Sequence, residues 1–132
     1  MNTRIKHLLF IILVLNSSLF ANSIEIPQKI ITGLKQGNVE LISEYFNDNI
    51  ELTINSKENV YSSTQAKIIL KDFFKKNKAL DFKILHQGGK TESKYAIGSL
   101  KTVQGNFRIT ILLKLDNTTP YIHQLRIEKD DI

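Results

Sequence analysis

Two histidines are the side chains in this sequence with the clearest capacity for chemistry. His86 and His123 lie in segments where apolar and polar residues alternate, which is the period of a half-buried strand. A neutral imidazole can serve as a general base or as a ligand near neutral pH. The alternation puts both rings on the inward face of a sheet, so the sequence predicts a polar spot at one end of an apolar cavity.

No acidic side chain is predicted on that face to orient or charge either ring, as a histidine base would need. The expected strand pairing also separates the two rings by three strand spacings, about 14 Å on a flat sheet. The simpler interpretation is two histidines at strand ends, half exposed at the rim of the cavity. We name no catalytic residue and favour a non-enzymatic role. A pocket enzyme of the isomerase, dehydratase or hydrolase type, with His86 or His123 as base, is the alternative.

Neither a metal nor a cofactor is expected. The sequence has three histidines and no cysteine, and two candidate histidines without Asp or Glu at ligand spacing do not make a ligand set. Gly88 and Gly89 precede no helix, so they do not form a phosphate cradle. The other pocket candidates are the aromatic residues Tyr45, Phe73 and Phe82, which suit a small apolar ligand.

The stretch from Ser62 to Lys76 predicts the long helix that organises the domain. Ser62, followed three residues later by Gln65, is a capping-box pattern that satisfies two backbone N–H groups at a helix start. Apolar residues recur at helical spacing and form one stripe: Ala66, Ile69, Leu70, Phe73 and Phe74. We expect this stripe to lie against a sheet.

Four strands after the helix predict an antiparallel meander. They run from Leu80 to Gln87, Tyr95 to Val103, Asn106 to Leu115 and Tyr121 to Glu128. A two-residue loop at Gln104-Gly105 would place Leu100 opposite Ile109. An unbroken apolar face in the last hairpin would place Leu113 opposite His123. Gly88-Gly89-Lys90 is the expected turn after the first of these strands.

The N-terminal part of the domain predicts two helices and a short hairpin. Helical spacing from Ile26 to Phe46 is interrupted at Gly37-Asn38, where the glycine fits a C-cap and the asparagine an N-cap. Asn47-Asp48-Asn49 indicates a turn, Ile50 to Ile54 a strand, and Val60-Tyr61 a short return strand. The expected fold is α+β: a curved antiparallel sheet of four to six strands wrapped around the long helix, with two N-terminal helices.

Residues 1–21 have the features of a secretory signal peptide, and residues 22–132 are expected to form a single cone-shaped domain. Arg4 and Lys6 precede an unbroken apolar run from Leu8 to Leu15. Cleavage is expected after Ala21, or else after Ser23. An uncleaved membrane anchor is the alternative, although polar residues 16–18 end the run before it is long enough to span a bilayer. The cleaved domain would be exported, periplasmic or secreted, without a stable membrane anchor.

Removal of the signal lowers the formal net charge from +5 to +3, because it carries two basic residues and no acidic one. So small an excess gives no reason to expect a nucleic acid partner. The exposed face of the long helix is basic and could contact a membrane surface, although such faces are more often simply solvated. Its lysines are Lys67, Lys71, Lys75, Lys76 and Lys78.

An apolar patch is predicted on the outer face of the sheet, where no helix is expected to cover it. It comprises Leu85, Tyr95, Ile97 and Leu112, bordered by Lys101, Arg108, Lys114 and Arg126. An apolar centre inside a polar rim is typical of a protein interface, so we expect a homodimer through this face. A monomer, in which long Lys and Arg stems break up the patch, is the alternative.

Several segments resemble a family of small exported bacterial proteins of unknown function. They are Gln65-Ala66, Ile69 to Phe74, Phe82 to Gly88, Tyr95 to Gly98 and Gln124 to Glu128. The order of elements resembles the nuclear-transport-factor-two-like, or cystatin-like, cone fold, in which a curved sheet and a long helix enclose a pocket. The resemblance implies this fold and implies that the protein is exported. Enzymes of that superfamily place Asp, Tyr or His in the pocket, and its members commonly pair through the outer face.

We therefore expect an exported, non-enzymatic domain that binds a small apolar ligand or a protein partner. The pocket enzyme and a membrane-surface module are the alternatives. Fold alone does not decide among them.

Overall fold

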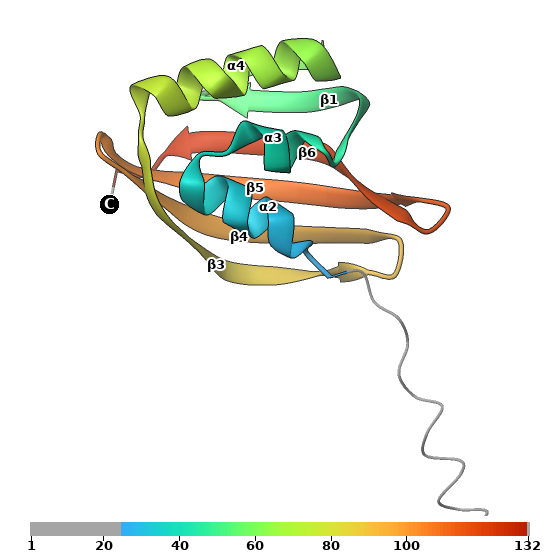
Figure 1. Ribbon diagram of the computed structural model, residues 1–132. Helices are drawn as coiled ribbons and strands as arrows, with labels where there is room; N and C mark the ends of the chain where they lie inside the picture. The colour runs from blue at the N-terminus through green and yellow to red at the C-terminus, as the bar shows by residue number, and fades with distance from the viewer. Residues whose placement is uncertain (1–24, 132) are drawn as a thin grey trace, which may run out of the picture.

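The computed structural model describes residues 25–131 (Figure 1). The predicted signal peptide and both cleavage positions lie outside these residues. In chain order the elements are α2 (Gln28–Gln36), α3 (Val39–Ser43), β1 (Phe46–Ile54), β2 (Lys57–Ser62), α4 (Ser63–Lys76), β3 (Ala79–Lys90), β4 (Ser93–Thr102), β5 (Gly105–Asp116) and β6 (Thr119–Lys129). This composition confirms the predicted α+β class.

The six strands form one sheet in the order β2-β1-β6-β5-β4-β3. Every neighbouring pair is antiparallel except β1 and β6, the second and third strands in this order, which run parallel. The prediction of a wholly antiparallel sheet is wrong at this pairing. After β2, helix α4 carries the chain to the opposite edge, and the meander from β3 to β6 then returns to the centre (Figure 1). The last strand of the meander, β6, therefore lies beside β1 and runs in the same direction as β1.

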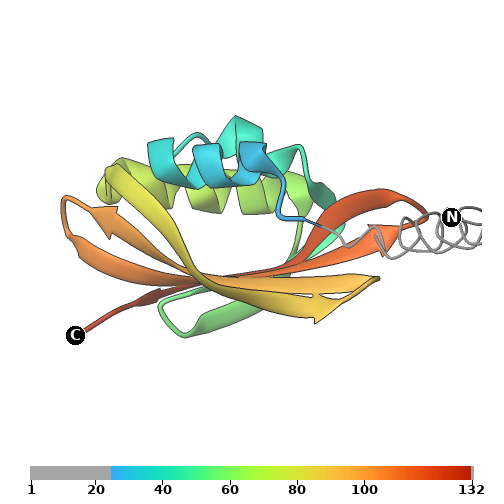
Figure 2. The same ribbon diagram turned by 90° about the horizontal axis from the view of Figure 1, so that it is seen from below.

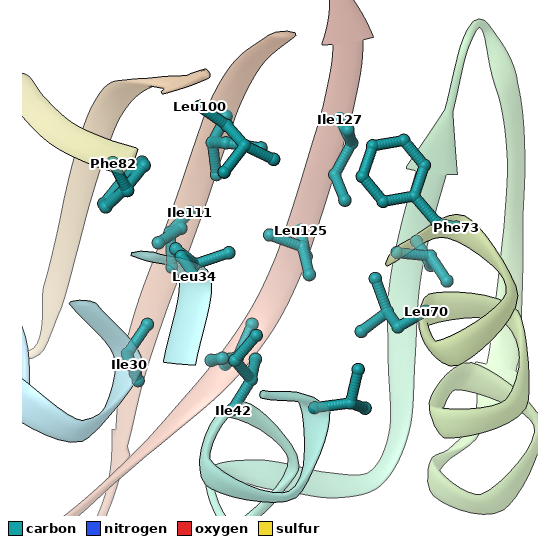
Figure 3. Close-up of a cluster of buried hydrophobic side chains, with 14 of the residues drawn as sticks. Ile30, Leu34, Ile42, Leu70, Phe73, Phe82, Leu100, Ile111, Leu125 and Ile127 are labelled. Carbon is teal, nitrogen blue, oxygen red and sulfur yellow. The ribbon is translucent and has the colours of Figure 1, made fainter. Parts of the chain in front are cut away.

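The described helices all lie on one face of the sheet (Figure 2). Helix α2 covers the β3 side, and α4 covers β1 and β2. The sheet thus curves around a layer of helices, with the long helix at one end of the layer rather than at its centre. Figure 3 shows Ile30 and Leu34 of α2 beside Phe82 and Ile111, while Leu70 and Phe73 of α4 lie beside Leu125 and Ile127.

Helix α4 begins as its sequence predicts. The Ser62 side chain accepts a hydrogen bond from the Gln65 backbone N–H, and the Gln65 side chain accepts one from the Ser62 N–H, which completes the capping box. All members of the apolar stripe are buried except Ile69, which is half-buried. The Phe73 ring makes an edge-on contact with Phe107 at a centroid distance of 5.0 Å. The stripe therefore faces the core, as expected.

The two N-terminal helices also end and begin at the predicted residues. Gly37 has φ of +66° and closes α2, and the Asn38 side chain caps α3 by accepting from the Leu41 N–H. Helix α3 is shorter than predicted, however, and the expected turn at residues 47–49 is strand. The reason is that the Tyr45 carbonyl accepts a hydrogen bond from the Ile122 N–H at 2.7 Å, which draws the chain into the sheet immediately after the helix.

The hairpin between β4 and β5 differs from its predicted register by two residues. Leu100 lies opposite Phe107 rather than Ile109, because the turn occupies residues 103–104. The Thr102 hydroxyl fixes this turn with two hydrogen bonds. It donates to the Gly105 carbonyl at 2.7 Å and accepts from the Gln104 backbone N–H. A shift of two residues leaves every side chain on its predicted face. The turn expected at Gly88-Gly89-Lys90 also moves, since β3 continues to Lys90.

Candidate functional site

A groove between α4 and the β1–β2 hairpin is the concave site best suited to a small molecule. It has a volume of about 310 Å³. Its apolar lining comes from both sides: Leu52, Ile54, Tyr61, Ile69 and Phe73. Its polar lining is Asn55, Lys57, Asp72, Lys76 and Asn77. An apolar lining with a few polar groups is the usual make-up of a ligand pocket.

Two features of the local backbone position this groove. Asn55 and Ser56 both have positive φ, 48° and 70°, so the β1–β2 hairpin turns tightly and its two strands stay paired to the tip. At the other side, the Asn77 backbone N–H and side-chain amide both donate to the Phe73 carbonyl, at 2.8 and 3.0 Å, and end α4 there. The last turn of the helix is therefore held beside the hairpin.

Opposite charges meet at the mouth of the groove. The Lys76 ammonium lies 3.0 Å from an Asp72 carboxylate oxygen, one helical turn away. Both side chains are well exposed, so this ion pair contributes little to stability. The Lys57 ammonium is a further cation at the mouth. A ligand with an apolar body and one polar group could satisfy both the lining and the mouth.

The predicted pocket candidates do not come together in this groove. Phe73 alone lines it. Phe82 is buried at the opposite end of the core, beside Gly98. Tyr45 is half-buried at a separate hollow beside the β5–β6 turn. Sequence reasoning missed Ile54 and Tyr61 as lining residues, because only their long-range packing against α4 makes them so.

The prediction that His86 lies on the inner face is wrong. The pairing of β3 with β4 shifts by one residue between Ile84 and His86, and His86 stands opposite Ile97 on the outer face. Its imidazole Nε2 lies 2.9 Å from the Tyr95 hydroxyl, and the residue is exposed. A single extra residue at Leu85 causes this change, because it reverses the alternation for the rest of the strand.

His123 is also displaced from the inner face by one extra residue in its strand. The pairing of β5 with β6 shifts after Leu112, so that Ile122 rather than His123 stands opposite Leu113. Ile122 is fully buried. The His123 Nε2 instead lies 3.9 Å from a Glu51 carboxylate oxygen, and both side chains are about 40% exposed, at 39% and 40%. Neither histidine can therefore act as a base within the groove.

The outer face of the sheet carries the predicted apolar patch and no described helix covers it (Figure 2). Tyr95, Ile97 and Leu112 are half-buried among their neighbours, and Leu85 is 67% exposed. The charges around the patch are unevenly distributed. Basic residues lie on the β3, β4 and β5 side: Lys83, Lys101 and Arg108. Acidic residues outnumber basic ones on the β1, β2 and β6 side: Glu51, Glu58 and Glu128 lie there with Arg126, which is 3.9 Å from Glu58 and 2.8 Å from Glu128.

The lysine face of α4 is tied to a neighbouring helix. Lys67 and Lys71 place their ammonium groups 3.0 and 2.7 Å from the two Glu40 carboxylate oxygens. The hydrogen bond from Lys71 and then that from Lys67 lower the pKa of the Glu40 carboxyl. Part of the basic face is thus neutralised by α3, which weakens the case for a membrane-surface module.

Within residues 25–131, no helix has the length and the hydrophobicity that a bilayer span requires. No three His, Asp or Glu side chains of that segment converge as a metal ion would require.

Comparison with known proteins identifies close relatives by fold and sequence. A crystal structure of a DUF4783 family protein from Bacteroides ovatus is 36% identical, with a TM-score of 0.78, over 82% of this chain and 98% of that one. The corresponding protein from Bacteroides uniformis is 32% identical, with a TM-score of 0.77, over 82% of this chain and all of its own. An NTF2-like protein of unknown function from Cytophaga hutchinsonii shares the fold at 14% identity, with a TM-score of 0.56, over 78% and 85% of the two chains.

Among curated proteins none matches this chain. The family model described as a domain of unknown function, DUF4783, matches residues 27–128. These matches confirm the predicted resemblance to a family of unknown function with an NTF2-like fold. The chain belongs to the DUF4783 family.

Proposed function

We propose that this protein is an exported, non-enzymatic domain that binds a small and largely apolar ligand in the groove between α4 and the β1–β2 hairpin. The observation that carries the proposal is the groove itself. Its volume of about 310 Å³ is at the lower end of the range for ligand pockets. Ile54, Tyr61 and Ile69 remain only half-buried there, so the fold leaves their apolar surface available.

The mouth of the groove indicates which end of a ligand would face solvent. Lys57 and the Asp72–Lys76 pair lie there, while Leu52 and Phe73 are buried at the lining. Burying a charged group against the apolar side would be costly without a partner. The ligand's polar group is therefore placed at the mouth and its apolar body against Ile69 and Phe73.

Two neighbouring isoleucines on α4 provide a matched test. Ile69 lines the groove, whereas Ile68 is 64% exposed and points away from it. Ile69→Trp should fill the groove and Ile68→Trp should not. Decanoate binding to the mature protein is measured by NMR titration, and the unmodified protein is also examined by native mass spectrometry for a co-purified ligand.

We expect decanoate to bind the unmodified protein and the Ile68→Trp variant equally, and to bind Ile69→Trp at least about tenfold more weakly. Equal binding by all three proteins would place decanoate elsewhere. If none of the three proteins binds decanoate and no apolar molecule co-purifies with the unmodified protein, the proposal is wrong.

The uneven distribution of charge on the outer face favours a second function, self-association. A two-fold axis parallel to the strands would place β2 and β1 of one copy over β3 and β4 of the other. The acidic side would then meet the basic side twice, around an apolar centre of Ile97 and Leu112. An axis across the strands would instead bring like charges together. Asp81 is an acid at the basic edge, and it lies 3.6 Å from the Lys35 ammonium.

Charge reversal tests this arrangement. Leu112→Lys should give a folded monomer, as measured by sedimentation equilibrium. Glu58→Lys and Lys83→Glu should each weaken the dimer, and the double variant should restore it. A mature protein that is monomeric at high micromolar concentration would exclude the dimer, and a double variant no better than the single ones would exclude this orientation.

A further inference from the structure

A second hollow lies at the corner where the α3–β1 junction meets the β5–β6 turn. Its volume is about 500 Å³, larger than that of the groove. Three aromatic side chains line it: Tyr45, Phe46 and Tyr121. Carboxylate and amide groups join them, among them Glu44, Asn47 and Asp116. The β5–β6 turn projects beyond the rest of the sheet at the right of Figure 1, which leaves this corner open.

The hollow lies where the pairing of β1 with β6 is interrupted. Phe46 stands opposite Ile122, and the next pairing joins Glu51 to Gln124. Residues 47–50 of β1 thus correspond to a single residue of β6 and are not paired with it, although Asn49 and Ile50 remain paired with β2. The hydrogen bond from the Ile122 N–H to the Tyr45 carbonyl, at 2.7 Å, fixes the chain just before this stretch. Backbone hydrogen bonding therefore holds Tyr45 and Phe46 at one side of the hollow.

The aromatic rings around the hollow are incompletely packed. Tyr45, Phe46 and Tyr121 are all half-buried. The Tyr121 ring makes an edge-on contact with His123, at a centroid distance of 6.5 Å, rather than stacking face to face. Three partly available aromatic surfaces in one concavity are able to receive the apolar faces of a ligand.

The polar groups of the hollow select against anions. No Lys or Arg side chain lines it in the described part of the chain, whereas Glu44 and Asp116 do. The Lys29 ammonium is near but already engaged, at 2.9 Å from Glu44, and that hydrogen bond raises the pKa of Lys29. What remains are acceptors and neutral amides, which suit a ligand rich in hydroxyl donors.

We infer that the hollow formed by Tyr45, Phe46, Tyr121, Asn47 and Asp116 binds a neutral saccharide. Sugar rings present C–H faces that pack on aromatic rings, and their hydroxyls donate to carboxylate and amide oxygens. The aromatic residues and the polar residues of the hollow supply both kinds of contact. The site is separate from the groove, and this inference stands whether or not the groove binds an apolar ligand.

The test uses the mature protein and a panel of methyl glycosides of glucose, galactose, mannose and N-acetylglucosamine. Binding is detected by saturation-transfer NMR and measured by titration of backbone amide shifts. Tyr121→Ala and Asp116→Asn address the hollow. Val103→Ala and Glu92→Gln are the controls, because both residues are exposed and neither lines the hollow.

At least one glycoside should bind, with its shifts centred on residues 44–47 and 116–121. Tyr121→Ala should weaken that binding about tenfold or more, and the controls should leave it unchanged. Thermal unfolding of each variant shows that it has folded. Absence of binding by every glycoside, or equal loss in the controls, would overturn the inference. Binding of choline in place of glycosides, lost in Asp116→Asn, would show a cation site instead.

Discussion

Truncation of Phe73 is the most direct test of how the long helix holds the domain together. The residue is 5% exposed, and its ring meets Phe107 at 5.0 Å and Phe74 at 5.2 Å, both edge-on. Phe→Ala in a core costs about 3–5 kcal/mol, and each aromatic pair adds about 0.5–1.5 kcal/mol beyond buried area. The groove on the other side of the ring reduces this cost, because water can enter the space that the ring leaves.

We therefore expect Phe73→Ala to lower the free energy of unfolding by about 3 kcal/mol, near the bottom of the core range. That is a large part of the 5–15 kcal/mol typical of a domain, and it should lower Tm by about 12 °C or more. Urea denaturation followed by circular dichroism measures the change. Lys75→Ala, on the exposed face of α4, is the control and should stay within about 0.5 kcal/mol. A loss below about 1 kcal/mol for Phe73→Ala would refute the argument that the stripe faces a core.

Three other predictions test the packing, the electrostatics and the export of the domain. Gly98→Ala should cost about 2 kcal/mol or more in urea denaturation, because a Cβ there would lie 2.5 Å from the Phe82 ring and 2.6 Å from the Lys83 carbonyl oxygen, which cannot move aside; Ser99→Ala, facing outward, should be nearly neutral. Glu40 has a pKa lowered by Lys71 and Lys67, so its contribution is present above its unfolded pKa, about 4.3, and is lost as pH falls through the lower folded value. Glu40→Gln should therefore be less stable than the unmodified protein at pH 7, and the difference should vanish in acid or high salt. The mature N-terminus should be Asn22 or Ile24 by intact mass of protein from the envelope fraction, and retention of residues 1–21 there would contradict export.

The sequence was sufficient to predict those elements that are determined by contacts between residues close together in the chain. The capping box at Ser62 and the glycine at position 37 fix helix ends through contacts within a few residues, and both are where they were predicted. The inner face of β5 also follows from alternation, because no bulge interrupts that strand between Phe107 and Leu113. Such features depend on period and capping chemistry, which a single sequence carries.

The candidate site was not predictable in the same way. One inserted residue in β3 and one in β6 turned His86 and His123 outward, and nothing in the alternation of either strand marks the insertion. The lining of the groove depends on α4 packing over Ile54 and Tyr61 of the hairpin that precedes it, which is a tertiary contact. The Glu51–His123 contact arises from the parallel pairing of β1 with β6, and no local pattern encodes it.

The parallel pairing of β1 with β6 also determines the order in which the chain can fold. The meander from β3 to β6 joins neighbours in sequence through tight turns, so its contacts close short loops. Strand β1 must wait for the final strand, more than sixty residues later in the chain, before its inner edge is paired. Contacts of such long range raise the relative contact order and slow folding. During synthesis β1 and β2 are the first strands to emerge, as a hairpin in which the β1 edge that later meets β6 is still open, and the pairing of β1 with β6 is among the last contacts to form.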